Sequence, residues 1–357
     1  MEKQEALQSI LDKTQSKSQS VWRKTKDPLR VKTTDMTEQF DIPSEKLKTV
    51  DDIYAQKGYC IIGQIDSGSY GDVLKGQHLE TKTLIAIKKI TIKEPFDKKT
   101  KDERKREDAL IDVKNELFAL ERLHHPHVIT LIQHFMIRTD FSLNLHILMQ
   151  LADGGNLLKQ CHKFGPFDEK QCKLWFAQML SGLSYMHKEG IAHRDLKCDN
   201  ILLGIAKDVL ISDFGLSRLV WRKSKGDLLS QTFCGTPPYM APEVLIVEKK
   251  SQMKYNAFKA DVWALGVILY RMFDNTYPFP KSRPKALKYM KKQKWKFSKS
   301  RQPSRQLNSF LKTIFNSTET ERPTTIELQK HVWIEKAFKE TEIKSRKKIQ
   351  ETDKNSK

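Results

Sequence analysis

Apolar residues in the first compact part of the chain fall in short runs of strand length. Between Cys60 and Leu151 the runs read CIIGQI, GDVLKG, LIAIKKI, VITLIQHF and LHILM, and turn residues such as Gly76-Gln77-His78 separate them. Such β-branched runs, bounded by turn residues, predict strands. One stretch, ALIDVKNELFALERL, has apolar residues at steps of three and four instead: Leu110, Val113, Leu117, Leu120 and Leu123. This spacing predicts one helix among the strands.

The pattern changes to helical periods from Asn156 onward. CKLWFAQMLSGLSYMHKEG has one apolar face and a glycine stop at Gly190. ADVWALGVILYRMF is apolar nearly all round, which is typical of a buried helix. The order predicts a small strand-rich lobe, residues 58–151, followed by a larger helical lobe, residues 152–334. A cleft between two lobes is a common place for a small ligand.

Both ends of the chain lack a sustained apolar period. Residues 1–57 are rich in Lys, Gln, Ser, Thr and Asp, and we expect this basic extension to be disordered. Residues 335–357 carry many charges and few apolar side chains, so we expect a solvated, charged tail.

The composition is strongly basic, with 64 Lys and Arg against 44 Asp and Glu, a formal charge of +20. Such a charge attracts ATP, acidic proteins, RNA and anionic lipid alike, so by itself it names no partner. Five scattered cysteines without a Cys-x-x-Cys pair favour a reduced protein without a zinc site. Because no signal peptide or apolar run of membrane-spanning length is visible, we expect a cytosolic or nuclear protein that binds no membrane.

Candidate chemistry gathers in two neighbouring motifs of the larger lobe. HRDLKCDN contains Asp195 and Asn200, and SDFG contains Asp213. The segment between them, ILLGIAKDVLI, predicts a strand-turn-strand that brings these side chains to one edge. Their oxygen atoms suit Mg²⁺, which also keeps water and phosphate ligands. In the smaller lobe, Lys88 lies on the apolar strand IAIK, where Glu116 and ATP phosphates would offset the cost of burying its charge.

Taken together, the motifs resemble those of eukaryotic protein kinases. IAIK at 85–88, HRDLKCDN at 193–200, DFG at 213–215 and APE at 241–243 follow one another in family order across residues 59 to 334. The resemblance implies an α+β, bilobal kinase fold across residues 58–334. Its small lobe would hold a five-stranded antiparallel sheet with one helix, and its larger lobe would be mainly helical. It further implies a protein kinase that uses ATP and Mg²⁺.

The resemblance also assigns roles to individual residues. Asp195 would accept the proton of the substrate hydroxyl, and Lys197 would neutralise charge on the transferred phosphoryl group. Asn200 and Asp213 would hold Mg²⁺. The ATP-binding positions would be Ile65, Ser67, Gly68, Gly71, Val73, Ala86, Lys88, Glu116, Met149, Gln150, Leu151 and Ala152.

Several of these positions have a more specific role, or a rival, within the same resemblance. Lys88 would hold the α- and β-phosphates and pair with Glu116, with Glu121 on the same helix as the alternative. Met149 would stand at the pocket wall, and residues 150–152 would face adenine through backbone groups. Three scaffold residues would support the larger lobe: Asp261, the carboxylate in its buried helix, and the ion pair of Glu243 with Arg322.

The glycine-rich stretch QIDSGSYGDV departs from the family pattern at one position. Gly68 and Gly71 are present, but Asp66 replaces the first glycine. Its carboxylate would repel a triphosphate, so a pseudokinase scaffold is the alternative to an active enzyme. Because every charged group implied in the chemistry is present, we predict an active enzyme with weakened ATP affinity.

The type of kinase is indicated by residues 193–200, which the resemblance makes the catalytic loop, and by the segment that follows them. Lys197 and Thr236 match the serine/threonine pattern, in which the threonine bonds Asp195 and Lys197 and helps to position the substrate. The stretches QTFCGTPPYMAPE, DVWALGVILY and RPTTIELQKHVWI resemble the calcium/calmodulin-dependent kinase-like group, and within it the testis-specific serine/threonine kinases. PPYMAPE departs from the usual version of that subfamily. The tail has too few apolar anchors to favour calmodulin binding.

Regulation is expected in the loop between Asp213 and Glu243. Thr232 stands where the family places its activating phosphate, and Arg194 and Arg218 would gather around it. An upstream kinase or autophosphorylation would supply the phosphate. Ser230 and Ser224 are weaker candidates, and an ordinary loop threonine is the alternative reading of Thr232.

The sequence says less about partners. Protein substrates with Ser or Thr are implied, and Asn156 and Arg271 indicate that selection for upstream arginine is weak or altered. The long basic segment between Lys88 and Glu116, including residues 91–110, is either a solvated loop or a docking site for an acidic partner or nucleic acid. Specific nucleic-acid binding by the whole chain is not favoured, because basic and aromatic residues do not interleave as in RNA-binding modules.

Overall fold

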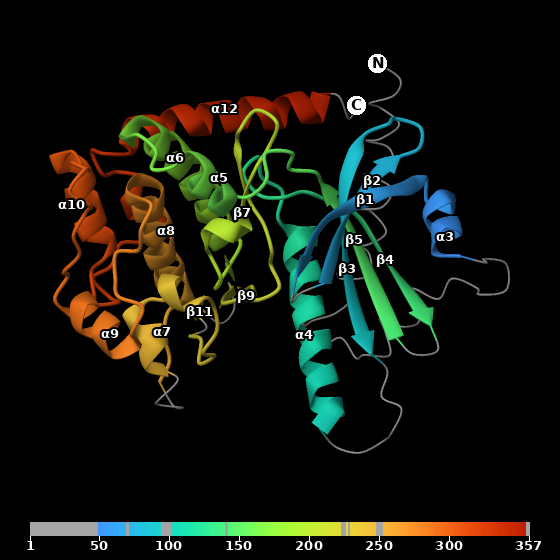
Figure 1. Cartoon of the computed structure of the whole chain (residues 1–357), viewed down its shortest axis with the longest axis horizontal. Coiled ribbons are helices and arrows are strands. Elements are labelled where there is room, and N and C mark those ends of the chain that lie inside the picture. Colours follow the sequence, from blue (N-terminus) through green and yellow to red (C-terminus); the bar gives the residue numbers. More distant parts are fainter. Residues whose placement is uncertain are drawn as a thin grey trace. The chain divides into compact units, whose positions relative to one another are not determined.

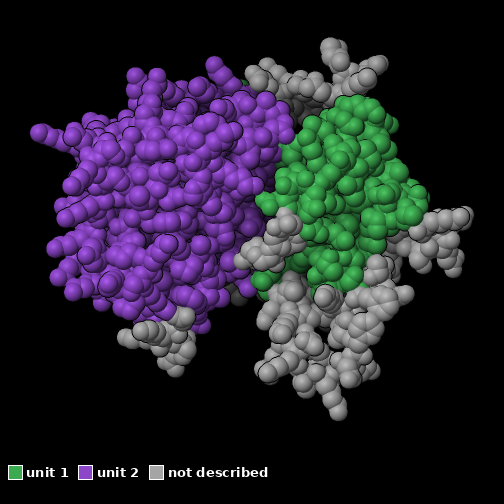
Figure 2. Space-filling view, viewed as in Figure 1, with its two compact units in different colours: residues 1–114, 130–151, 349–357 green, residues 115–129, 152–348 purple. Residues whose placement is uncertain are grey.

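The protein forms two compact units, seen in Figure 2. The computed structural model describes residues 49–68, 71–93, 101–139, 142–222, 226–227, 229–247 and 253–354. The first unit comprises residues 1–114, 130–151 and 349–357, and the second comprises 115–129 and 152–348. No helix among the described residues is long and apolar enough to cross a membrane.

A five-stranded antiparallel sheet forms the body of the first unit (Figure 1). Its strands are β1 (Tyr59–Gly68), β2 (Gly71–His78), β3 (Leu84–Lys93), β4 (Leu131–Thr139) and β5 (Ser142–Gln150). They lie in the order β1-β2-β3-β5-β4. The predicted five-stranded sheet is therefore confirmed, and each β-branched run of the sequence supplies one strand.

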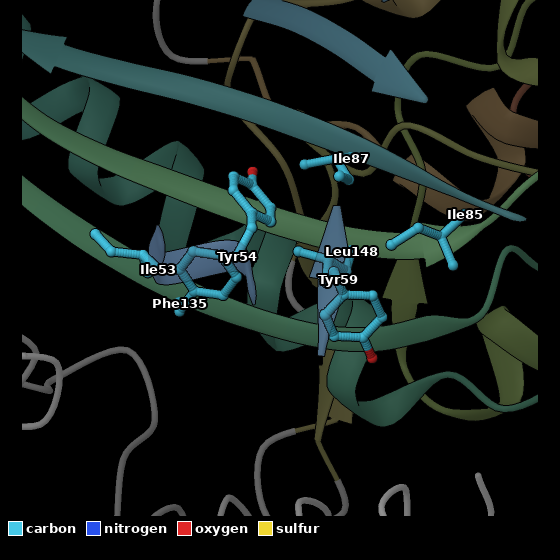
Figure 3. Close-up of a cluster of buried hydrophobic side chains, with 7 residues drawn as sticks. All are labelled: Ile53, Tyr54, Tyr59, Ile85, Ile87, Phe135 and Leu148. Carbon is cyan, nitrogen blue, oxygen red and sulfur yellow. The ribbon is translucent and has the colours of Figure 1, made fainter. Parts of the chain in front are cut away.

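One face of this sheet carries an apolar cluster that includes a short helix, α3 (Val50–Gln56). Figure 3 shows its members, which come from α3 and four strands: Ile53, Tyr54, Tyr59, Ile85, Ile87, Phe135 and Leu148. The Tyr54 hydroxyl lies 2.6 Å from Nδ1 of the buried His146 on β5. The prediction that residues 1–57 are disordered was therefore wrong for Val50–Gln56, while residues 1–48 lie outside the described ones.

The physical reason for this correction is a local start signal combined with a distant partner. Thr49 and Asp52 form a reciprocal capping box, in which each side chain bonds the other residue's backbone N–H. A helix of seven residues is too short to persist alone. Ile53 and Tyr54 become buried because the sheet provides an apolar surface for them.

The predicted helix among the strands is α4 (Lys101–Arg122). Four of the five periodic positions are buried: Val113, Leu117 and Leu120 on α4, and Leu123 directly after its last residue, while the side chain of Leu110 lies outside the described part. Of the basic segment, residues 94–100 lie outside the described ones, and the helix itself begins within it, at Lys101.

The second unit is mainly helical, as predicted (Figure 1). Its helices up to the catalytic region are α5 (Leu157–Phe164) and α6 (Glu169–Lys188). Later helices are α7 (Pro242–Val247), α8 (Ala257–Asp274), α9 (Arg283–Lys291), α10 (Arg305–Ile314), α11 (Thr325–Leu328) and α12 (Glu335–Lys354). Short strands lie between α6 and α7: β6 (Ile191–Ala192), β7 (Ile201–Leu203), β8 (Val209–Ile211), β9 (Arg218–Leu219), β10 (Trp221–Arg222) and β11 (Gly226–Asp227). The apolar helix ADVWALGVILYRMF lies within α8, which is buried along most of its length.

The charged tail predicted at residues 335–357 is mostly the helix α12, drawn in red in Figure 1. Phe338, Thr341 and Ser345 are buried on one face of it. The Ser181 hydroxyl of α6 donates a 2.5 Å hydrogen bond to Glu342. The expectation of a solvated tail was wrong, because a contact face made of one aromatic and small polar residues gives no apolar period in the sequence.

Candidate active site

The carboxylate of Asp195 lies at the centre of a hydrogen-bond network in the second unit. The Thr236 hydroxyl donates to Oδ1 over 2.8 Å, and the Lys197 ammonium donates to Oδ2 over 2.7 Å. The same ammonium lies 3.2 Å from the Thr236 hydroxyl oxygen. Nδ2 of Asn200 donates to the Asp195 backbone carbonyl over 2.9 Å and to Oδ2 over 3.3 Å. Both carboxylate oxygens are thus held in fixed directions.

A close approach of two backbones makes the contact between Thr236 and Asp195 possible. Gly235 has φ +107°, and a Cβ atom there would lie 2.8 Å from the carbonyl oxygen of Arg194. Only glycine fits this position without strain, because it has no Cβ and tolerates positive φ. The segment that carries Thr236 can therefore lie directly against the catalytic loop.

The carboxylate of Asp261 on α8 fixes the backbone of the loop at residues 193–194 through hydrogen bonds. Its Oδ2 accepts from the N–H of His193 over 2.8 Å, and its Oδ1 accepts from the N–H of Arg194 over 2.8 Å. His187 adds a third contact, 3.0 Å from Nε2 to Oδ2. Arg194 has φ +66°, a strained conformation for a non-glycine residue, and these bonds stabilise it. The sequence predicted that Asp261 needs partners, and the structure identifies them.

The β7–β8 hairpin places Asp213 next to the same loop. The Ser212 N–H and hydroxyl both donate to the carbonyl of Asn200, over 2.9 and 3.0 Å. His193 donates from Nε2 to the Ser212 carbonyl over 2.9 Å, because a carbonyl can only accept. Asp213 itself has φ +64°. The predicted hairpin thus brings Asn200 and Asp213 to one edge.

The donor chemistry at this edge fits Mg²⁺. Nδ2 of Asn200 is occupied by Asp195, so the side-chain atom of Asn200 that remains for a cation is the oxygen Oδ1. The Asp213 carboxylate supplies further oxygen, and Mg²⁺ prefers such hard oxygen ligands alongside phosphate and water. Among the described residues, no cluster of three or more His, Cys, Asp or Glu forms a closed metal site. A two-residue oxygen site that shares its metal with phosphate is consistent with that.

The charge of Lys197 is stabilised by its surroundings. Burial lowers the pKa of its ammonium, but the hydrogen bond to Asp195 and the charges of Asp195, Asp213 and Asp199 outweigh burial. The pKa of Lys197 is therefore raised above its ordinary value, and the side chain stays a cation. A cation beside Asp195 suits a reaction that develops negative charge there.

In the first unit, four predicted ATP-binding residues share one face of the sheet: Val73, Ala86, Lys88 and Met149. Val73 is paired with Lys88, and Ala86 with Met149, in the antiparallel register. Because side chains alternate along a strand, Ala86 and Lys88 point away from Ile85 and Ile87, which belong to the cluster of Figure 3. Lys88 is 8% exposed on that face.

The glycine-rich stretch forms the end of β1 and the start of β2. Gly68 is paired with Gly71, and Asp66 with Val73, while Ile65 lies at an irregularity in the register between Gln64 and Asp66. Asp66 is exposed and is not among the described non-glycine residues with positive φ. The strand therefore continues through Asp66, and its backbone does not need the glycine that the family pattern has. The side chain of Ser67 lies outside the described part.

Three remaining predicted nucleotide contacts come from the end of β5 and the chain after it. The Gln150 N–H donates to the carbonyl of Thr130 over 3.0 Å, which fixes the end of the strand. Gln150, Leu151 and Ala152 are half-buried, and the two units divide between Leu151 and Ala152.

On α4, the structure separates the two candidate partners of Lys88 by burial. Glu116 is 3% exposed, whereas Glu121 is half-buried. A Cβ atom at Gly215, the glycine of the DFG motif, would lie 3.7 Å from Oε2 of Glu116, so this carboxylate is close to that motif. This favours Glu116 as the functional glutamate. Its pairing with Lys88 stays a prediction.

Around the predicted phosphorylation site, Thr232 is exposed, and its carbonyl accepts from the Tyr255 hydroxyl over 2.9 Å. Arg194 donates from Nε to the Leu216 carbonyl over 2.7 Å and from Nη1 to the Ser230 hydroxyl over 3.3 Å. Ser230 itself is buried. Arg218 begins β9, and Ser224 lies outside the described residues.

Glu243 and Arg322 form a two-point ion pair, with distances of 2.6 and 3.0 Å between guanidinium nitrogens and carboxylate oxygens. Arg322 is fully buried, and its guanidinium also lies 4.9 Å from the ring centre of Trp263. Such a pair is a scaffold feature, since breaking it leaves a buried charge without a partner.

Sequence reasoning missed the polar residues that connect these parts. His187, His193 and Ser212 were given no role, yet they position Asp261, Asp195 and Asn200. The sequence did contain one indication of these roles. Polar residues within apolar stretches need hydrogen-bond partners once they are buried.

Comparison with known proteins agrees with this geometry. Residues 59–334 match the family described as the protein kinase domain. CBL-interacting protein kinase 26 of Oryza sativa subsp. japonica is 30% identical over 288 residues, which cover 81% of this chain and 54% of the relative. Sperm motility kinase 3A of Mus musculus is 34% identical over 297 residues, covering 82% and 53%. CBL-interacting serine/threonine-protein kinase 18 of Arabidopsis thaliana is 31% identical over 272 residues, covering 76% and 48%.

The chain thus spans about half the length of these curated relatives. The sperm motility kinases support the predicted likeness to testis-specific kinases. Because the family match covers residues 59–334 and includes both the sheet and the catalytic loop, the chain belongs to the protein kinase family.

Proposed function

We propose that this protein transfers the γ-phosphoryl group of Mg-ATP to serine and threonine hydroxyls of protein substrates. The observation that carries the proposal is the network around Asp195, whose carboxylate is held between the Thr236 hydroxyl and the Lys197 ammonium. The site offers one oriented base and one adjacent cation, which is what phosphoryl transfer to a hydroxyl requires.

In the proposed reaction, the substrate hydroxyl lies against Asp195, which orients it and accepts its proton. Lys197 neutralises charge on the transferred phosphoryl group from its position 2.7 Å from Asp195. Asn200 and Asp213 would hold Mg²⁺, which supplies charge neutralisation for the phosphate oxygens. Catalysis then consists of positioning and electrostatic stabilisation. Asp261 acts through the loop backbone and is a positioning residue.

The choice of serine or threonine as acceptor is supported by two observations. The Thr236 hydroxyl bridges Asp195 and Lys197, as the serine/threonine pattern implies. The printed names of several relatives include serine/threonine-protein kinase.

Asp195→Asn tests the activity. Purified protein with Mg-ATP and a basic protein substrate should incorporate phosphate, and Asp195→Asn should lower kcat by about a thousandfold. Asp208→Asn, which removes the same charge in the turn of the β7–β8 hairpin, outside residues 193–200, is the matched control. Equal incorporation by wild type and Asp195→Asn would contradict the proposal and favour the pseudokinase alternative.

We further propose that phosphorylation of Thr232, by an upstream kinase or by the protein itself, raises activity. The exposure of Thr232 and the position of Arg194, which bonds Ser230 two residues away, support this. A phosphate there would form charge-assisted hydrogen bonds with arginine and order the loop. Phosphosite mapping with and without ATP should show whether Thr232 is phosphorylated. The variant Thr232→Ala should lose about tenfold in kcat. Thr320→Ala at another exposed site is the control, and an equal effect of both variants would refute the role.

The expectations on location and calmodulin are also proposals. A cytosolic or nuclear location can be checked by microscopy of the tagged full chain, and a secreted or membrane-bound pool would contradict it. The proposal that calmodulin does not control the chain rests on the few apolar anchors in the tail, of which Phe338 is buried. Calcium-dependent capture of the chain on immobilised calmodulin would refute that proposal.

A further inference from the structure

A long part of the second unit contains no carboxylate side chain. Residues 275–318 include no Asp or Glu but twelve Lys and Arg. Eight of the lysines are exposed, and we call them the basic surface: Lys281, Lys285, Lys288, Lys291, Lys292, Lys294, Lys296 and Lys299. Like charges so dense, without neutralising neighbours in sequence, create a local field that attracts anions.

The basic surface begins next to the segment that carries Thr232 and Thr236. Arg283, the first residue of α9, donates to the carbonyl of Leu245 on α7. Its guanidinium also lies 5.3 Å from the ring centre of the exposed Phe233. Figure 1 shows α9 beside α7 in the second unit.

The other end of the basic surface is fixed to the end of α8. The Tyr270 hydroxyl donates to the carbonyl of Lys296 over 2.7 Å. The Ser298 N–H donates to Oδ1 of Asp274 over 2.8 Å. These bonds hold Lys296 and Lys299 close to the last turn of α8, where Arg271 lies.

Arg271 is a buried cation with no carboxylate partner among the residues that the structure describes. It is 8% exposed, and its guanidinium lies 4.9 Å from the ring centre of Tyr277. Within the described part of the chain it donates no hydrogen bond, and its Nε is sealed from solvent. A buried charge with unsatisfied donors is costly, which is a reason to look for an anionic ligand.

The nearby carboxylates have other partners. Asp274, one turn along α8, accepts from Ser298 and Thr276. Asp168 caps α6 by accepting from Gln171, and Glu169 accepts from Ser304 and Trp333. None of the three pairs with Arg271 in the described structure.

Two aromatic rings connect Arg271 to the loop that carries Asp195. The ring of Tyr277 is 5.7 Å from that of Tyr239, centre to centre, and Tyr239 follows Thr236 by three residues. The Tyr239 hydroxyl accepts from the N–H of Cys198 in the catalytic loop over 3.4 Å. An extended peptide advances about 3.3 Å per residue, so an anionic side chain a few residues from an acceptor at Asp195 can reach Arg271.

We propose that Arg271 and the basic surface bind anionic side chains, carboxylate or phosphate, that flank the acceptor in the protein substrate. This inference rests on the proposed kinase activity and names the substrate class of that site. A peptide is favoured over nucleic acid because the buried guanidinium, which has no carboxylate partner in the described part of the chain, is connected through Tyr277 and Tyr239 to the loop that carries Asp195. The one large aromatic exposed among the lysines, Tyr289, makes a poor platform for stacked bases.

The experiment compares serine peptides that differ by a single residue at each flanking position: Asp, phosphoserine, Arg or Ala. With the full chain, an anionic residue at one or more positions should raise kcat/KM about tenfold over Ala, and Arg should not. The Asp and phosphoserine series distinguish the two anionic sources. Turnover of the Ala peptide tests the kinase activity separately from the selection.

Variants of Arg271 and of the basic surface test which residues select anionic peptides. Arg271→Gln and Arg271→Lys should each reduce the ratio of kcat/KM for anionic over neutral peptide, because both lose the planar guanidinium, and Gln should be the more severe because it also removes the positive charge. The ratio is informative because a merely structural defect would lower both rates together. Lys288, Lys291 and Lys292 changed together to Gln should reduce the ratio about threefold.

A matched triple variant controls for total charge. Lys336, Lys344 and Lys347 are exposed on α12, and changing all three to Gln removes the same charge elsewhere. Binding of a labelled acidic peptide, with alanine at the acceptor, to the full chain gives a second readout that needs no turnover. The proposal is overturned if Arg is selected, if no flanking charge matters, if both triple variants act equally, or if an RNA oligonucleotide binds the α9 lysines more tightly than the peptide.

Discussion

The loop at residues 193–200 in the second unit and the five-stranded sheet of the first unit are built in different ways. Residues 193–200 contain little regular structure, and side-chain hydrogen bonds from Asp261, Thr236 and Asn200 fix them. In the sheet, Ala86 and Lys88 are placed by the strand ladder, and an apolar cluster supports the opposite face. The loop therefore depends on single polar contacts, whereas the sheet depends on distributed packing.

The largest effect is expected where one side chain holds a strained backbone. Asp261→Ala removes the acceptor for two backbone N–H groups and should lower kcat by about a thousandfold. Asp274→Ala, on the same helix but bonded to Ser298 and Thr276, is the control. Steady-state kinetics with a neutral peptide measures both variants, and equal losses would show that Asp261 has no special link to the loop.

In the sheet of the first unit, the largest loss of stability is expected when an apolar side chain of the cluster is shortened. Ile87→Ala should lower the free energy of unfolding by about 4 kcal/mol, because it leaves a cavity in the cluster of Figure 3. Ile62, which is 50% exposed on β1, gives the control Ile62→Ala with little change. Urea unfolding measures both. A small loss for Ile87→Ala would mean that the cluster does not support the sheet.

A pH dependence of stability follows from His146, which contacts Tyr54 of this cluster. Burial, and then the charge of Lys89, lowers the pKa of His146 to about 4. The unfolded chain takes up this proton near pH 6.5, while the folded protein resists it until about pH 4. The contribution of neutral His146 to the free energy of unfolding is thus fully present above pH 6.5. It is lost, by about 3 kcal/mol, as the pH falls to 4. In unit 2, burial lowers the pKa of His125 to about 3, which adds to the effect.

His146→Gln tests this contribution. Thermal unfolding between pH 7 and pH 4 should show a shallower loss of stability in the variant than in wild type, with His125 responsible for part of the remaining slope. An identical slope in both proteins would contradict the role of His146.

The smallest effect concerns Asp66. Asp66→Gly should lower the KM for ATP about threefold, since the charge is exposed and water screens it. Because β1 continues through this residue without positive φ, Asp66→Asn should give a similar change. An unchanged or raised KM in both variants would show that the charge costs nothing. A change with Gly alone would assign the effect to the backbone.

The fold was predictable where the period of the pattern matched the element. Five β-branched runs became five strands, and ALIDVKNELFALERL became part of α4. Prediction failed at α3 and α12, where the buried faces are short or carry Thr and Ser in place of aliphatic residues. Such faces are recognisable only once their partner surface is known.

Within the site, motif spacing identified the chemical groups but not what holds them. Asp195, Lys197, Asn200 and Asp213 were found from their order in the chain. The roles of His187, His193 and Ser212 were not found, because nothing in the sequence places α8 beneath the catalytic loop or Ser212 beside Asn200.

The sequence by itself determined the kinase family, the strand and helix order, the candidate catalytic groups and the irregular Asp66. These properties depend on local periodicity and on residue types at short, fixed spacings. The tertiary structure alone decided that Glu116 is more buried than Glu121, that Arg271 has no carboxylate partner among the described residues, and that both ends of the described chain pack onto the fold. Burial and charge pairing arise from contacts between residues far apart in sequence, and no local pattern specifies them.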